Sequence, residues 1–434
     1  MPMKKVLLFF GILIFACIVS PAQKLLTADS AAALALKNNF DIRIARTTAD
    51  ISKRNNTAGN AGMLPDVGIT ATDAYSLDHV NQHNYDAPAT SAANANSNSL
   101  SAGIALNWTL FDGGKMFVTK RKLNEIEALG EIQFRNQVMQ TLSDVYAGYF
   151  NVVRQKEELQ AILEVIRFNQ ERVDLLQTGF NAGLSPKTDL LQAQIDLNVY
   201  QEDAISQQAV ILAARRQLNQ LLSRDPEEPF EVVDSIIQDY HPDKKELAQK
   251  LFSVNPLVLS SQKQVELARL GVNEFRALML PNLNFSAGYD LLHSDYAIGT
   301  VRMNETYGPQ LGATLSIPLY QAGNIRRQVA VARLQLESAK VTFESTKLQV
   351  NTQLQLALTE YDNQLQLLRI EKDNFALARE NLTISMQRLR LGQTTALEVR
   401  QAQESFQQSL TRLTDFGYAA KVAEIRLKQL LGAL

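Results

Sequence analysis

The sequence is poor in the residues that build catalytic and metal sites. Among its 434 residues are one cysteine, Cys17, and four histidines, His79, His83, His241 and His293. His79 and His83 stand four positions apart, but no cysteine or carboxylate constellation accompanies them, so no metal site is expected. No Gly-x-Ser-x-Gly or His-Glu-x-x-His motif occurs, which leaves a secreted hydrolase without a nucleophile and base. We therefore expect neither an enzyme nor a cofactor-binding protein.

The sequence also lacks a charge imbalance. It has 43 Lys and Arg against 45 Asp and Glu, a formal net charge of −2, so no nucleic-acid partner is expected. An apolar fraction of 46% is too high for a disordered chain, and 12 Pro and 20 Gly are too few for a collagen-like one. The remaining candidates are a folded protein of two or three domains and a single elongated architecture.

No uncharged apolar run reaches the roughly 18 residues of a membrane-spanning helix. The longest comprises residues 6–19 and follows Lys4 and Lys5. Ser20-Pro21-Ala22 then supplies small residues where a signal peptidase cuts. Residues 1–22 are therefore predicted to be a secretory signal peptide.

Cleavage there would make Gln23 the first mature residue and would remove Cys17, the only cysteine. A chain without thiols fits the oxidising cell envelope. The alternative is lipoprotein processing at Cys17, for which the preceding Ala16 is suitable but the bulky Phe15 is not.

The sequence contains an internal duplication. At an offset of 216, Leu64-Pro65-Asp66-Val67 recurs as Leu280-Pro281-Asn282-Leu283, and Asn39 as Asn255. At an offset of 209, three further segments recur: Phe111-Asp112-Gly113-Gly114 as Tyr320-Gln321-Ala322-Gly323, Ala182-Gly183-Leu184 as Leu391-Gly392-Gln393, and Gln192-Ala193-Gln194 as Gln401-Ala402-Gln403. This ordered series predicts a first repeat at residues 23–222, a connecting segment at 223–246 and a second repeat at 247–434.

Each repeat contains a very long helical segment. Gly114 and Gly183 stand 69 positions apart, as do Gly323 and Gly392, and no proline intervenes. A helix of that length extends roughly 100 Å, and about 40 residues of returning helix follow each one. Spacings of three and four predict a coiled-coil seam with one polar interruption, formed by Leu159, Ile162, Ile166, Asn169, Val173, Leu176 and Phe180. The polar residues on the other faces fit either a solvated surface or the lining of a water-filled space.

Four segments alternate apolar residues with small or polar ones. They lie at residues 103–110, 283–290 and 311–317, and a weaker fourth run begins at residues 67–71. Each is close to the roughly ten residues of a tilted transmembrane β-strand, although a half-buried strand of a soluble sheet has the same pattern. We expect two hairpins, at residues 64–111 and 280–319, with long polar loops at Ser76–Ser99 and His293–Tyr307.

Four strands cannot close a membrane barrel, because the smallest barrels have about eight. An open sheet edge in lipid leaves backbone groups unpaired, at a cost of several kcal/mol each. If these strands span a membrane, several copies of the chain must therefore share one barrel. Three copies would give twelve strands, but the need for a closed barrel does not fix the number of copies.

Together these features resemble the TolC family of outer-membrane efflux ducts. The resemblance covers the chain from about Leu25 to Leu434 and depends on the order and spacing of its landmarks. These are the Leu-Pro before the first strand of each repeat, Phe111-Asp112-Gly113-Gly114 and Leu319-Tyr320-Gln321-Ala322-Gly323 after the second strand, and Gly183 and Gly392 between the long helices, each followed by Gln-Ala-Gln.

The resemblance implies an α+β membrane protein that assembles as a homotrimer. Four strands per copy would form a twelve-stranded barrel in outer-membrane lipid, and the long helices a periplasmic coiled-coil tunnel with residues 224–246 in a belt around its middle. It further implies an exit duct of a tripartite efflux or type I secretion system. Such a duct docks on a periplasmic adaptor protein, which joins it to an inner-membrane pump of the RND, ABC or MFS type, and it carries out no chemistry.

The resemblance also implies two groups of site residues. The adaptor-docking tips would be Ala182, Gly183, Leu184, Leu391, Gly392 and Gln393, although a glycine also ends a helix for backbone reasons alone. The periplasmic aperture would be formed by Asp189, Glu398 and Gln401, of which Gln401 departs from the family's acidic pattern. Three copies of Glu398 would still form an anionic collar that attracts cations. The alternative is that both acids are favoured simply by the dipole in the first turn of a helix.

The competing interpretation is a periplasmic coiled-coil structural protein, soluble or lipid-anchored, with a small β head. It accounts for the helices but not for four strands of membrane length flanked by polar segments. Partition into the outer membrane separates the two interpretations.

Overall fold

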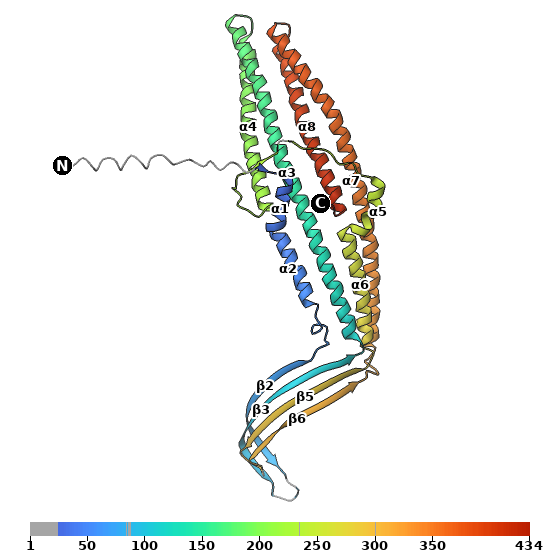
Figure 1. The fold of residues 1–434 in the computed structure, drawn as a ribbon. Helices are drawn as coiled ribbons and strands as arrows, with labels where there is room; N and C mark the ends of the chain where they lie inside the picture. Colours follow the sequence, from blue (N-terminus) through green and yellow to red (C-terminus); the bar gives the residue numbers. More distant parts are fainter. Residues whose placement is uncertain (1–24, 84, 86–87, 234, 300) are drawn as a thin grey trace, which may run out of the picture. The chain divides into compact units, whose positions relative to one another are not determined.

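The computed structural model describes residues 25–83, 85, 88–233, 235–299 and 301–434 (Figure 1). The predicted signal peptide, including Cys17, lies outside the described residues. The described chain forms two compact units. One contains the residues up to Ile44, Asn136–Leu251 and Asn351–Leu434, and the other contains Ala45–Arg135 and Phe252–Val350.

The predicted duplication and its very long helices are confirmed. The helices of the first half are α1 (Ala28–Asn38), α2 (Phe40–Asn55), α3 (Lys115–Asn181) and α4 (Lys187–Leu221), and those of the second half are α5 (Lys244–Val254), α6 (Pro256–Ala277), α7 (Asn324–Arg390) and α8 (Ala396–Leu430). The helices α3 and α7 have 67 residues each, and α4 and α8 have 35 each. None of the described helices is both long and apolar enough to cross a membrane.

The repeated asparagines have the same role in each half. The Oδ1 atom of Asn39 accepts hydrogen bonds from the backbone N–H groups of Asp41 and Ile42, at 2.9 and 3.1 Å. The Oδ1 atom of Asn255 accepts two bonds in the same way, at 3.0 and 3.3 Å, from the start of α6. A helix start leaves such N–H groups unpaired, and an Asn cap satisfies them. The recurrence of Asn therefore reflects recurrence of a helix start.

The four long strands form one antiparallel sheet in the second unit. They are β2 (Asp66–Gln82), β3 (Thr90–Asp112), β5 (Asn282–Tyr296) and β6 (Met303–Ser316), in the order β2-β3-β5-β6. Two hairpins, one from each half, therefore lie side by side (Figure 1).

The predicted strand lengths were wrong. The strands have 17, 23, 15 and 14 residues, so most of the expected loops at Ser76–Ser99 and His293–Tyr307 is extended and paired. The alternating pattern ends where both faces of a strand become polar. The backbone hydrogen bonds of a hairpin continue beyond that point, because they do not depend on side-chain polarity.

The connecting residues after α4 pack firmly into the first unit. Phe230 and Val232 are buried in a core that also contains Tyr149 of α3. The hydroxyl of Tyr149 donates a 3.0 Å hydrogen bond to the carbonyl of Leu26. The two-residue strands β1 (Leu25–Leu26) and β4 (Glu231–Val232) pair in parallel. The start of the described chain and the connecting segment are thus held together.

The predicted seam on α3 is largely buried. Val173 and Leu176 pack against the α4 residues Leu190, Ala193 and Leu197. A second stripe was not predicted: Val165 and Phe168 pack against α7 and α8, through residues such as Leu382 and Phe406. Phe180, placed at the end of the seam, is 38% exposed. The α3 helix therefore buries a wider face than a single heptad seam.

Candidate functional site

The sheet has one apolar face. Residues directly opposite each other in antiparallel strands point to the same side, so the register aligns one row of Val67, Leu106, Ala287 and Leu311 and a second of Ile69, Ile104 and Tyr289. Most of these side chains are exposed in the single chain, among them Ile69 at 80% and Leu311 at 78%. A large exposed apolar patch of this kind marks a surface that something else must cover, and lipid covers it in a membrane barrel.

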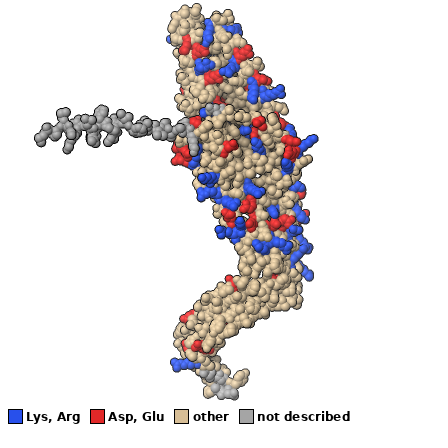
Figure 2. Space-filling model, in the orientation of Figure 1, with Lys and Arg blue, Asp and Glu red and all other residues tan. Residues whose placement is uncertain are grey.

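The other face of the sheet is small and polar. Its rows include Gly103 opposite Asp290, Ala105 opposite Gly288, and Asn107 opposite Ser286. Counted over both faces, the four long strands contain seven Asp or Glu residues and no Lys or Arg. Figure 2 shows charged side chains gathered over the helices and few over the sheet. This face has the polarity that a water-filled lumen requires.

The two edge strands of the sheet run in opposite directions. Strands β2 and β6 each have one partner within the sheet, β3 and β5 respectively. Because all three pairings are antiparallel, β2 and β6 are themselves antiparallel. The β6 edge of one copy can therefore pair with the β2 edge of another without breaking the alternation.

The described residues at the polar ends of the hairpins form no group that could hold a metal ion. His79 lies within the extended strand β2, so the helical spacing that would pair it with His83 does not arise. In the part of the chain that the structure describes, no three His, Cys, Asp or Glu side chains come together in a way that could hold a metal ion.

The predicted tips are two matching helix ends in the first unit. At the end of α3, the N–H of Leu184 donates to the carbonyl of Gly179 at 2.8 Å, and Gly183 has a φ of +73°. At the end of α7, the N–H of Gln393 donates to the carbonyl of Arg388, also at 2.8 Å, and Gly392 has a φ of +67°. This bond and the left-handed glycine define a Schellman motif. Helix termination thus accounts for both glycines.

A groove of about 530 Å³ lies between the two tips and is lined by residues of both. It is lined from the first repeat by residues that include Ala182, Leu184 and Asp189, and from the second by residues that include Leu391 and Gly392. Leu184 is 83% exposed and Leu391 70% exposed. Gly183 and Gln393 are not among the residues that line the groove. These residues occupy equivalent positions of the two repeats in the sequence, and in the structure they lie next to each other.

Glu398, in the first turn of α8, is held by several groups of its own hairpin. Arg388 forms an ion pair with it through Nη1 at 3.0 Å, and Thr394 Oγ1 donates to its other carboxylate oxygen. Its backbone N–H donates to Oγ1 of the N-cap residue Thr395 at 3.3 Å. The same arginine donates through Nη2 to the carbonyl of Gln393 at 3.2 Å. Glu398 and Arg388 thus close the turn between α7 and α8.

The other two predicted aperture residues have different surroundings. Asp189 lies in the first turn of α4, where the N-cap Pro186 makes no side-chain cap bond, and it lines the tip groove. Within the described residues, the structure records no ion pair of its carboxylate. Gln401 is exposed on α8. The structure therefore brings Asp189 to the tip groove, but it shows no contact of Asp189 with Glu398 or Gln401.

A buried polar cluster near the tips was missed by the sequence analysis. Arg172 of α3 is 2% exposed, donates to Oε1 of Gln403 on α8 at 2.7 Å and pairs with Asp196 on α4 at 2.5 Å. With Asn169 these residues line a cavity of about 150 Å³. Asn169 was recognised as an interruption of the seam, but Arg172 lies on the second stripe, four positions after Phe168, which was not predicted. The cluster joins three helices in one place.

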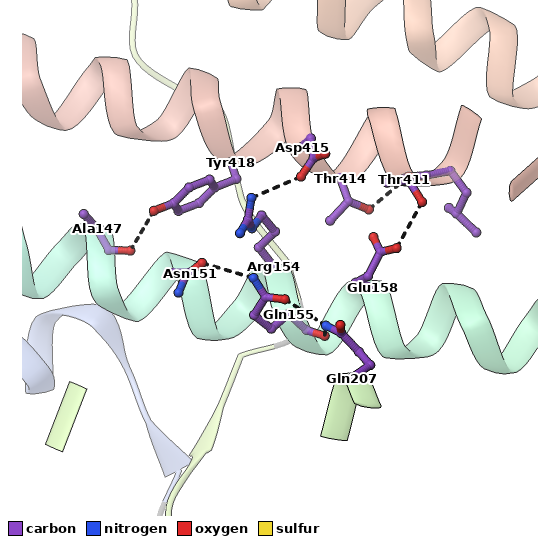
Figure 3. A network of polar contacts seen from close by, with 11 residues as sticks. Ala147, Asn151, Arg154, Gln155, Glu158, Gln207, Thr411, Thr414, Asp415 and Tyr418 are labelled. Atoms are coloured by element: carbon purple, nitrogen blue, oxygen red, sulfur yellow. Dashed lines mark hydrogen bonds and ion pairs between the residues drawn. The ribbon is translucent and has the colours of Figure 1, made fainter. Parts of the chain in front are cut away.

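A second polar network joins α3 to α8 (Figure 3). Arg154 pairs with Asp415 at 3.2 Å and lies over the ring of Tyr418, 4.7 Å from its centroid. Oγ1 of Thr411 donates to Glu158 at 3.0 Å. These contacts tie the first repeat to the second, because α3 and α8 belong to different halves of the sequence.

Comparison with known proteins gives a consistent result. The sequence profile of the outer membrane efflux protein family matches residues 31–224 and 247–433. The chain is 21% identical over 413 residues to the proteases secretion protein PrtF of Dickeya chrysanthemi, covering 92% of this chain and 87% of PrtF. It is 21% identical over 428 residues to the outer membrane protein TolC of Escherichia coli (strain K12), covering 96% and 83%.

The fold also matches a solved structure. The chain aligns with the CmeC outer membrane channel of Campylobacter jejuni with a TM-score of 0.80 and 17% sequence identity, covering 94% of this chain and 85% of that one. At this identity the similarity shows the fold.

Proposed function

Because the chain belongs to the outer membrane efflux protein family and is an outer-membrane exit duct, we propose that three copies of it form one channel. Each copy contributes four strands to a twelve-stranded barrel, and the long helices build the periplasmic tunnel. The main observation in support of this proposal is the arrangement of the β2-β3-β5-β6 sheet. It has an apolar face, a small polar face and two antiparallel edges that only another copy can pair.

The helical tips are the docking surface for a periplasmic adaptor protein. The groove between them and the exposed Leu184 and Leu391 support this assignment, because exposed apolar residues that gather beside a groove are typical of protein-binding surfaces. The adaptor joins the duct to an inner-membrane pump, which supplies the energy. The pump and the adaptor select the cargo.

Asp189, Glu398 and Gln401 form the periplasmic aperture. Two of them lie in the first turns of α4 and α8, directly after the tips. In a trimer, each position would occur three times around the axis. A ring of charges of one sign at a constriction changes the local concentration of small ions.

The native mass of protein extracted by detergent from isolated outer membranes tests the shared barrel. We expect a particle of three chains that conducts ions when it is inserted into a planar lipid bilayer. A stable monomer in the same extract would contradict the shared barrel, since four strands cannot close one. Protein found only in the soluble periplasmic fraction would contradict the membrane assignment as well.

A further inference from the structure

The two acids predicted at the aperture differ in how far their charge is compensated. Glu398 and Arg388 are paired at 3.0 Å, and their side chains are 47% and 45% exposed, respectively. The guanidinium is held in place by its second hydrogen bond, to the carbonyl of Gln393. A fixed pair of opposite charges acts on a distant ion as a dipole, which is much weaker than a single charge. Glu398 therefore contributes little net charge to the tip.

The charge of Asp189 has no such compensating pair among the described residues. Among the described residues, no ion pair to its carboxylate is recorded, and it lines the groove between the tips. Lys187 is nearby in sequence but does not line that groove. Residues two positions apart on a helix lie about 200° apart around its axis, so Lys187 points away from Asp189.

Several other charges near the tips are paired between the repeats. Three arginines of the second repeat pair with acids of the first: Arg379 with Glu164 at 3.3 Å, Arg400 with Asp196 at 3.5 Å, and Arg390 with Glu171. These pairs leave Asp189 as the acid of the predicted aperture that has no cationic partner.

We infer that Arg388 sets the ion selectivity of the aperture by cancelling the charge of Glu398, so that Asp189 alone supplies its net negative charge. The inference depends on the proposed channel function. In place of an anionic collar formed by Glu398, the aperture then has a compensated Glu398–Arg388 pair, which also closes the α7–α8 turn. A channel built in this way selects weakly between cations and anions at its tip, which suits a duct whose cargo is chosen elsewhere.

The test is the reversal potential of single channels in a planar bilayer under a KCl gradient. Arg388→Gln should raise the cation-to-anion permeability ratio about threefold, because it exposes three charges that act over a screening length of about 8 Å. Glu398→Gln should lower the ratio, since it leaves Arg388 unpaired. The double variant should return to the wild-type ratio, and Asp189→Asn should lower it.

Arg379→Gln is the matched control, because it breaks an ion pair on the same helix nine residues before Arg388, about 14 Å away along the axis. It should change the ratio less than Arg388→Gln does. Native mass establishes that each variant still forms a trimer. If the variant trimers conduct but Arg388→Gln or Glu398→Gln leaves the permeability ratio unchanged, the inference is wrong while the proposed channel function stands. If wild-type trimers do not conduct, the channel function fails, and the inference with it.

Discussion

The carboxyl group of Glu158 is partly buried on α3, at the contact with α8 (Figure 3). Burial raises its pKa, the hydrogen bond from Thr411 lowers it, and the nearby Asp415 raises it again, with a net upward shift. A carboxyl group whose pKa is higher in the folded chain than in the unfolded chain costs stability as pH rises through that pKa. Below its unfolded pKa, the group is protonated in both states and carries no such cost.

Glu158→Gln should therefore stabilise the protein at neutral and alkaline pH. The amide oxygen of Gln can still accept the hydrogen bond from Thr411 Oγ1, while the cost of burying a charge disappears. We expect a gain of at most about 1 kcal/mol, the size of one net polar contact. It should appear as a higher apparent melting temperature in detergent at about pH 8 and vanish at about pH 4. The exposed Glu380→Gln is the control, and an equal gain in both variants would contradict the assignment to burial.

The sequence predicted where charged residues occur but not which of them pair. The first-turn positions of Asp189 and Glu398 followed from the helix boundaries, and both are observed. Arg388, by contrast, reaches Glu398 across the turn between two helices. That contact depends on the geometry of the turn and on the rotamers of both side chains. The periodicity of the sequence carries no information about either.

At the scale of elements, the tips depend on two left-handed glycines. An ideal Cβ at Gly392 would meet no atom within 4 Å, so a substitution there adds backbone strain without a steric clash. A residue with a Cβ pays roughly 1–2 kcal/mol in the left-handed conformation. Gly392→Ala should therefore lower the apparent melting temperature of the trimer in detergent.

Gly417→Ala is the matched control, because Gly417 lies in the interior of α8 and its Cβ would also meet no atom within 4 Å. There alanine should stabilise by about 0.5–1 kcal/mol, since glycine carries an entropic cost within a helix. The same substitution should thus have opposite signs at the two positions. Equal effects at both would show that the tip does not need a left-handed residue.

Helices were predicted more accurately than strands, for a physical reason. The two 67-residue helices, α3 and α7, are each bounded by glycines with positive φ, such as Gly114 and Gly183, and these glycines can be read directly from the sequence. The strands were recognised only where their two faces differ in polarity. Beyond Ser76 and His293 polar residues occur on both faces, so the alternation stopped although the pairing continued.

At the scale of the whole molecule, the sequence predicted that one chain cannot close a barrel but not how many chains do. That conclusion followed from four strands and from the cost of unpaired edges in lipid. The structure adds the order β2-β3-β5-β6 and the antiparallel relation of the two edges. These findings determine which edges must meet between copies. The number of copies depends on the curvature of the closed sheet, which no local pattern encodes.

The junction between copies can be tested by disulfide cross-linking, because the only native cysteine, Cys17, lies in the predicted signal peptide. Thr70 lies on β2, on the small polar face of the sheet. Thr70→Cys should be combined with one cysteine at a time on the same face of β6, at Gly308, Gln310, Gly312 or Thr314. Disulfides require Cβ atoms about 4 Å apart, so only one or two of these positions should cross-link.

We expect covalent dimers and trimers on non-reducing gels of oxidised outer membranes for those positions, and monomers after reduction. Thr70→Cys combined with Ser286→Cys is the matched control. Ser286 lies on the central strand β5, where both neighbours are already supplied by the same chain. Absence of cross-links at all four β6 positions would contradict pairing of β2 with β6. Cross-links at Ser286 would mean that copies meet through the face of the sheet instead of its edges.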